Sequence, residues 1–200
     1  MNATPETFPQ AAQAPAEAKS APKRNYFLIG LGVVVLMFAA TYIYAWFRSR
    51  ALTQEYLNNA NASYEQGDYL RALVGFDEYD EESQRYISRG GYFQVQRIWA
   101  HRYAWPKPPG LETANQRVDE IINERITIEQ AEQFIQVSAG RGNAYLGVIY
   151  LRLGELYEAE GDEREALEIY ESIPELFAGE EELIQRAEEH LRRLESSQTD

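Results

Sequence analysis

The sequence contains no cysteine and only two histidines. Without a thiol the chain can form no disulfide, no thiolate metal site and no cysteine nucleophile. The absence of cysteine neither supports nor excludes an extracytoplasmic location. His101 and His190 do not have the spacing of metal ligands or of a catalytic triad. His190 falls in a highly charged stretch, where a polar side chain is expected to be solvated. The sequence therefore predicts no catalytic, cofactor-binding or metal-binding residues, and an enzyme with an unrecognised site is the least favoured alternative.

Strand signals are also scarce. After residue 51 no run of alternating β-branched residues is bounded by turns, so we expect an all-α domain. The acidic run from Asp77 to Glu82 lacks the alternating oxygen ligands and central glycine of a calcium loop. We expect this run to be a solvated helix end instead of a metal site.

Basic side chains are few. The chain has 19 Lys and Arg against 32 Asp and Glu, a net charge of -13, and this balance excludes a broad basic footprint for nucleic acid. From residue 51 onward there are 14 basic and 30 acidic side chains, a net charge of -16. Such a domain should stand off from an anionic membrane surface unless it presents a local basic face. Other proteins are the expected partners.

One long stretch lacks charge altogether. Residues 1–25 are rich in Ala and Pro and are expected to form a disordered tail. The next 22 residues, Tyr26–Phe47, carry no charge, and as a helix they would extend about 33 Å, the thickness of a bilayer's hydrocarbon core. Aromatic residues stand at both ends, as they do at membrane interfaces. The sequence therefore predicts a transmembrane helix over 26–47 and a separate domain over 48–200.

A cleaved signal peptide is the competing reading of this stretch. Its apolar part would be shorter and would end in small residues, whereas this stretch ends in Tyr, Trp and Phe before Arg48. Lys19, Lys23 and Arg24 precede the stretch, and Arg48 and Arg50 follow it. Three basic residues against two favour an N-terminus inside and a C-terminal domain outside the cytoplasm.

Two similar segments occur in the domain, YEQGDYLRALVGF at 64–76 (the first glycine motif) and YEAEGDEREALEIY at 157–170 (the second glycine motif). In each, a glycine is expected to end one helix in the left-handed conformation and the following Asp to cap the next helix. A small residue five positions after the glycine would let two antiparallel helices approach closely, and a ring nine positions after it would fill the space beyond. These positions are Gly67, Ala72 and Phe76 in the first motif and Gly161, Ala166 and Tyr170 in the second.

The second glycine motif and the helix before it resemble the tetratricopeptide repeat, a 34-residue helix hairpin. The matching residues are Tyr150, Leu153, Gly154, Tyr157, Gly161, Asp162, Ala166 and Tyr170. The first motif matches less fully, with Asn59 and Ser63 where Leu and Tyr are usual. The resemblance covers residues 52–84 and 147–178. It implies an α-solenoid of helix hairpins that acts by protein–protein interaction without catalysis.

The region between the motifs departs from this repeat, because their glycines are 94 residues apart. It still reads as helical, with one stripe formed by Tyr92, Val95, Trp99 and Tyr103 and another by Val118, Ile121, Ile122 and Ile126. Thr127 and Gln130 have capping-box spacing for a further helix, and Asn143 is a candidate cap for the helix after it. A final amphipathic helix over 180–196 would cap the open end of the stack.

Residues 83–111 contain five basic and no acidic side chains, interleaved with aromatic rings. Two interpretations remain. In the first, the rings are core residues and the arginines neutralise neighbouring acidic helices. In the second, the segment is a docking surface, since Arg, Trp and Tyr dominate binding hot spots. In the second case the partner surface would be acidic, either a protein face or anionic headgroups. The candidate partner-binding residues are Arg97, Trp99, Arg102, Tyr103, Trp105 and Lys107.

The layout of a short tail, one span and an acidic repeat domain is similar to that of the ancillary subunit of the bacterial secretion translocon. This resemblance implies a membrane-anchored adaptor, scaffold or accessory subunit of a membrane protein complex. The alternative that it implies is a chaperone-like factor for exported proteins. No cofactor is expected under either reading.

Overall fold

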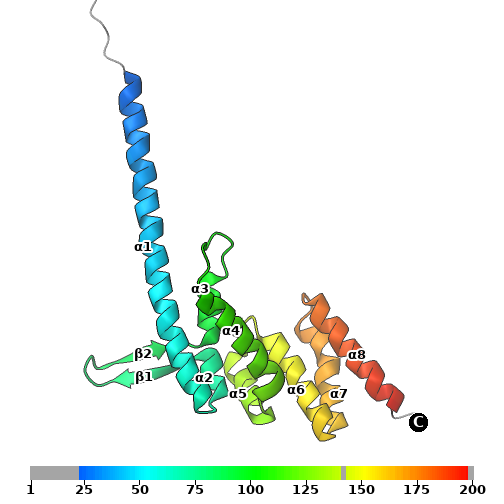
Figure 1. Cartoon of the computed structure of the whole chain (residues 1–200). Coiled ribbons are helices and arrows are strands. Elements are labelled where there is room, and N and C mark those ends of the chain that lie inside the picture. Colours follow the sequence, from blue (N-terminus) through cyan, green and yellow to red (C-terminus); the bar gives the residue numbers. More distant parts are fainter. Residues whose placement is uncertain (1–22, 141–142, 198–200) are drawn as a thin grey trace, which may run out of the picture. The chain divides into compact units, whose positions relative to one another are not determined.

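The computed structural model describes residues 23–140 and 143–197, and most of the expected tail at 1–25 lies outside this range. The chain divides into two compact units, Met1–Tyr44 and Ala45–Asp200. The described part is mostly helical, which confirms the main class that the sequence predicts (Figure 1). Helix α1, Lys23–Glu65, contributes residues to both units.

The first unit contains most of the apolar part of α1. Its most apolar 18-residue window has a mean hydropathy of 2.2 and no buried residue. Large side chains such as Phe27, Leu36 and Phe38 are all more than two-thirds exposed. By its length and composition this helix can cross a membrane, because it presents apolar side chains all round and supplies its own backbone hydrogen bonds.

The second unit is mostly helical (Figure 1). Its elements after α1 are α2 (Tyr69–Val74), β1 (Phe76–Asp80), β2 (Arg85–Arg89), α3 (Tyr92–Trp99), α4 (Pro109–Glu120), a π-helical turn η1 (Ile121–Arg125), α5 (Ile128–Ser138), α6 (Leu146–Glu160), α7 (Glu163–Leu176) and α8 (Glu181–Ser197). Several of these helices pack on their neighbours in the chain, as α3 on α4, α5 on α6, α6 on α7 and α7 on α8.

Both glycine motifs form the helix–turn–helix that their residues predict. Gly67 has a φ of +77° and Gly161 a φ of +85°, in the left-handed region that favours glycine. The Asp68 carboxylate accepts a hydrogen bond from the backbone N–H of Arg71, and Asp162 caps α7 in the same way. Each motif therefore ends one helix and starts the next through local bonds.

The helices of the second motif approach closely at Gly154. A Cβ atom at this position would lie 2.6 Å from Cε1 of Tyr170, which is inside van der Waals contact. Tyr170 and Ala166 are both fully buried, as is Ala72 in the first motif. A glycine on α6 thus leaves room for a large ring on α7.

The first motif ends differently from the second, and here the sequence reading is wrong. Helix α2 stops at Val74, because Gly75 adopts a φ of +73°, and the chain continues as an antiparallel hairpin in which β1 pairs with β2. Phe76 is therefore the first residue of a strand and not a ring on a helix. The guanidinium carbon of Arg71 lies over its ring, 4.9 Å from the ring centroid. The acidic run Asp77–Glu82 is the first strand and turn of this hairpin and not a helix end.

The segment between the motifs is helical and supplies much of the core. Three members of the first predicted stripe are buried in α3, but the helix ends at Trp99, so that Tyr103 lies outside it with 64% of its surface exposed. Thr127 forms the predicted capping box with Gln130 at the start of α5. Asn143 accepts from the N–H of Tyr145, which is itself the residue that precedes α6. All four residues of the second stripe are buried, namely Val118, Ile121, Ile122 and Ile126.

Two apolar clusters hold the unit together. The larger joins α1 to α7 and includes a stacked pair, Phe93 and Tyr145, with ring centroids 3.8 Å apart. The smaller joins α6, α7 and α8, where Leu183, Ala187 and Leu194 are the buried face of the last helix. Helix α8 therefore packs its apolar face against α6 and α7.

Candidate interaction surfaces

The six residues that the sequence selects for partner binding do not all lie on a surface. Trp99 is only 2% exposed, and its Nε1–H donates to Oγ1 of Thr53 on α1 at 2.7 Å. Its ring belongs to the core, as the first interpretation of the segment expected. The other five are exposed, and four of them lie in the loop 100–108 between α3 and α4. These are Arg97 on α3 and Arg102, Tyr103, Trp105 and Lys107 in the loop.

The loop 100–108 is attached to α1. The indole Nε1–H of Trp46 donates to the backbone carbonyl of Pro106 at 2.8 Å, and the ring of Trp46 meets Trp99 edge-on, with centroids 6.5 Å apart. Arg50 lies 5.5 Å from the Trp46 ring, and Arg102 lies 4.7 Å from the ring of Tyr103. Aromatic and cationic side chains of α1 and of the loop 100–108, which are far apart in the sequence, thus lie close together in the structure.

A second surface, a groove of about 700 Å³, lies between α5, α6 and α7. Its lining is aromatic, aliphatic and acidic, and it contains no Lys, Arg or His. The lining residues are Glu129, Glu132, Gln133, Ile135, Gln136, Tyr150, Leu153, Tyr157, Glu165, Glu168 and Ile169. Apolar side chains bordered by carboxylates favour a ligand that is both apolar and cationic.

Hydrogen bonds fix the two tyrosines of this groove. The Tyr157 hydroxyl donates to the Glu132 carboxylate at 2.6 Å, and this bond, with burial, raises the pKa of Tyr157 to about 12. The Tyr150 hydroxyl lies 3.0 Å from Oγ of Ser172 on α7. The Tyr157 phenol therefore stays neutral at ordinary pH, and the two hydroxyl contacts hold both rings in the groove.

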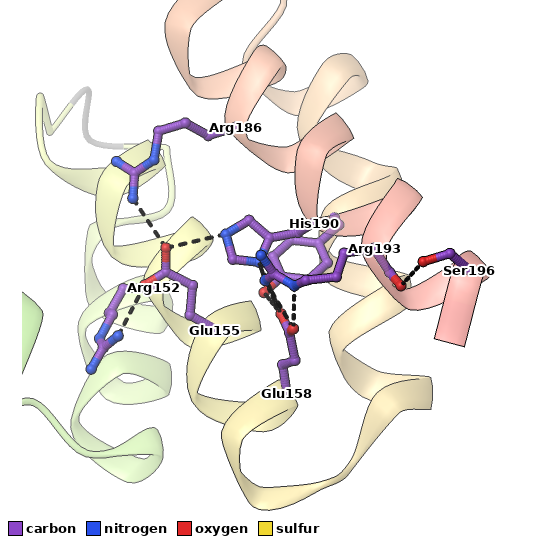
Figure 2. A network of polar contacts seen from close by, with 8 residues as sticks. Arg152, Glu155, Glu158, Arg186, His190, Arg193 and Ser196 are labelled. Carbon is purple, nitrogen blue, oxygen red and sulfur yellow. Dashed lines mark hydrogen bonds and ion pairs between the residues drawn. The ribbon is translucent and has the colours of Figure 1, made fainter. Parts of the chain in front are cut away.

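A third polar site joins α6 to α8 (Figure 2). His190, which the sequence places in solvent, is 16% exposed, with Nδ1 2.8 Å from Glu158 and Nε2 3.6 Å from Glu155. Arg193 also binds Glu158 at 2.9 Å, and Arg186 binds Glu155 at 3.0 Å. The expectation of a solvated His190 is wrong, because the α6 carboxylates and the buried Tyr170 ring, 4.7 Å away, face it.

The pKa of Glu158 reflects this environment. Burial alone would raise the pKa of the carboxyl, but hydrogen bonds from His190, Arg193 and Tyr170 favour the carboxylate and together lower it below its ordinary value. Burial and the same carboxylate raise the pKa of Tyr170. The charged network is therefore a contact that fixes α8 on α6, and among the described residues no group of three His, Asp or Glu is arranged to hold a metal ion.

No family model matches the chain, and comparisons with curated proteins and with solved structures find no match. We therefore infer its function from the chemistry of its own surfaces.

Sequence reasoning did not find the groove between α5, α6 and α7. A signal was present, because Glu129 and Glu132 on α5, and Glu165 and Glu168 on α7, repeat at a spacing of three, which puts each pair on one helix face. The sequence pattern alone does not show that these two helix faces lie on either side of Tyr157 in the fold.

Proposed function

We propose that the protein is a membrane-anchored adaptor or accessory subunit of a membrane protein complex, and that it acts by protein–protein interaction. In this proposal α1 crosses the bilayer, and the helix pairs of the second unit form a tetratricopeptide-like scaffold. The groove between α5, α6 and α7 receives an extended, basic segment of the partner.

The groove is the observation that carries this proposal. Its volume of about 700 Å³ is that of a ligand cleft. Four glutamates border it and no basic side chain lines it, so a partner segment with Lys or Arg would find complementary charge. Leu153, Ile135 and the rings of Tyr150 and Tyr157 offer apolar contact beside these charges. A short peptide that alternates apolar and basic residues satisfies both features.

The tetratricopeptide-like part of the proposal is supported by the turn geometry. Both glycine motifs combine a left-handed glycine, an Asp cap and a buried alanine, and the second adds the close approach of Gly154 to Tyr170. The hairpin β1–β2 interrupts the first motif. We propose one repeat-like pair at α6–α7 and a modified pair at α1–α2.

The orientation that we propose puts the N-terminus inside and residues 51–200 outside the cytoplasm, on the basic bias around the apolar stretch. Protease added to sealed, right-side-out cells should digest the domain. Complete protection, with digestion after lysis as the control, would reverse the orientation.

Site-specific photo-crosslinking in native membranes tests the groove. A photoreactive residue in place of Gln136 lines the groove, and one in place of Gln185, an exposed glutamine on α8, is the matched control. We expect crosslinks at position 136, and their loss when Glu129 and Glu168 are both replaced by Gln. Equal yields at the two positions would contradict the proposal.

The crosslinked material also separates the two functional alternatives. One discrete chain, recovered in constant proportion after detergent extraction, identifies an accessory subunit. A broad set of exported chains identifies the chaperone-like alternative instead.

A further inference from the structure

Within the second unit, Trp46 of α1 contacts the loop 100–108. Trp46 is next to last in the uncharged stretch Tyr26–Phe47, and Arg48 follows one position after Phe47. Its indole donates to the carbonyl of Pro106 at 2.8 Å, and both residues belong to the second unit. A tryptophan at the end of a span lies at the level of the lipid headgroups. In a chain whose α1 spans the bilayer, the loop that binds Trp46 would lie at that level too.

The loop exposes the side chains that suit this level. Trp105 is 73% exposed and Tyr103 is 64% exposed, and Trp105 is the most exposed large apolar side chain in the described part of the second unit. Rings with an apolar body and a polar tip are enriched at membrane interfaces. Water is a poor environment for two such rings in one short loop, and an interface is a favourable one.

The charges around these rings have one sign. Arg102 and Lys107 stand in the loop, Arg48 and Arg50 follow the apolar stretch, and no acidic residue occurs between positions 83 and 111. Within residues 23–140 and 143–197, no ion pair joins Arg102 or Lys107 to an acid. Among the described residues, the basic side chains of the loop therefore have no close acidic partner, and lipid phosphate groups could bind them.

We propose that the loop 100–108 lies in the headgroup layer of the bilayer that α1 crosses, with Tyr103 and Trp105 inserted at the interface and Arg102 and Lys107 bound to lipid phosphates. The loop is the local basic face that lets a domain with a net charge of -16 stay close to an anionic surface. Because Trp99, the last residue of α3, donates to Thr53 on α1, the contact would also fix the domain relative to the membrane surface.

Spin labelling of the full chain in vesicles tests this proposal. Because the sequence has no cysteine, Ala104→Cys and Ser83→Cys each give one labelling site, in the loop and in the exposed hairpin turn. In vesicles of equal parts phosphatidylcholine and phosphatidylglycerol, the ratio of oxygen to nickel-chelate collisions should be several-fold higher at position 104 than at position 83. Equal ratios would overturn the proposal.

Two paired substitutions identify the groups responsible. In the Ala104→Cys chain, replacing both Tyr103 and Trp105 by Ser should lower the ratio toward that of position 83. The same change at Tyr79 and Tyr86, two exposed rings that pack on each other in the hairpin, should leave it unchanged. An unchanged melting temperature verifies that each variant folds, and an equal ratio in all variants would contradict the role of the two rings.

The phosphate contact has its own test. Arg102→Gln with Lys107→Gln should lower the ratio at position 104 in vesicles with phosphatidylglycerol, and the difference should shrink in phosphatidylcholine alone or in added salt. Free inorganic phosphate at millimolar concentration should not compete, which separates lipid headgroups from a soluble phosphate ligand. If free phosphate abolishes the difference in collision ratio between the natural chain and this double variant, the assignment to lipid headgroups is wrong.

This inference rests on the membrane anchor in the proposed function and is independent of the groove. Failure of the chain to float with vesicles would contradict the anchor itself. Flotation with a water-exposed label at position 104 would contradict the loop contact alone. A label exposed in pure vesicles but protected in native membranes would assign the loop to a protein partner instead.

Discussion

Replacing Ala166 by Leu should overpack the contact between α6 and α7. Ala166 has no exposed surface, and Gly154 already touches the fully buried ring of Tyr170, so the two helices cannot separate without losing that contact. Three additional carbon atoms at a filled position cost about 1–3 kcal/mol of unfolding free energy. For a domain of this size, that loss corresponds to a fall in melting temperature of about 2–12 °C.

The matched control is Ala159→Leu, an exposed alanine on α6. It adds the same atoms in a helix at a position where they meet solvent, and it should change stability by less than about 0.5 kcal/mol. Circular dichroism of the full chain in detergent measures both melting temperatures. If Ala166→Leu melts within about 1 °C of Ala159→Leu, the tight packing of the second glycine motif is wrong. The corresponding change at Ala72 tests the first motif in the same way.

Two further predictions concern the core and the charged network. Trp99→Phe removes the bond to Thr53 and leaves a smaller ring in the core, which should cost about 1–3 kcal/mol, whereas the exposed Trp105→Phe should cost less than about 0.5 kcal/mol by urea unfolding. Glu158 has a lowered pKa when folded, so its contribution to stability is complete above its ordinary pKa of 4.5 and is lost as the pH falls through the lower folded value. Urea midpoints between about pH 6 and pH 3 should therefore fall less in Glu158→Gln than in the natural chain, and parallel pH profiles would contradict the role of this carboxylate.

Local interactions explain which parts of the fold were predictable. The turns at Gly67 and Gly161 are each set by one glycine and the Asp after it, which bond within a few residues, so the sequence pattern is sufficient. The capping box at Thr127 is local in the same way. The core stripe Val118–Ile126 follows from helical spacing, because one apolar face has to be buried.

The hairpin was missed because its stability comes from pairs between strands. Asp77, Glu78 and Asp80 are poor strand formers taken singly. In the structure Asp77 stands opposite Ser88 and receives a hydrogen bond from it, and Tyr79 stands opposite Tyr86 with ring centroids 5.3 Å apart. These pairs depend on register across the turn, which composition does not encode.

Trp99 and Trp105 show a similar limit for the candidate surface. Both stand in the same acid-free window and have the same chemistry, yet one donates to Thr53 in the core and the other is 73% exposed. The difference arises where α3 ends, after Trp99, and helix ends are set by tertiary contacts as well as by local sequence. The groove between α5, α6 and α7 is formed by side chains of three helices, so it is even harder to predict from local sequence.

The position of α1 at the beginning of the domain has a consequence for the timing of folding. Its residues Thr53 and Leu57 are buried, and Trp99 and Gly110, which lie against them, come much later in the chain. Trp99, which bonds Thr53, is synthesised 46 residues afterwards, a delay of roughly 2 to 9 seconds on the ribosome. During that interval the face of α1 that later lies in the core lacks its partners from α3 and α4. The nascent chain should therefore be most prone to aggregation, and most in need of a holding chaperone, before α3 has emerged.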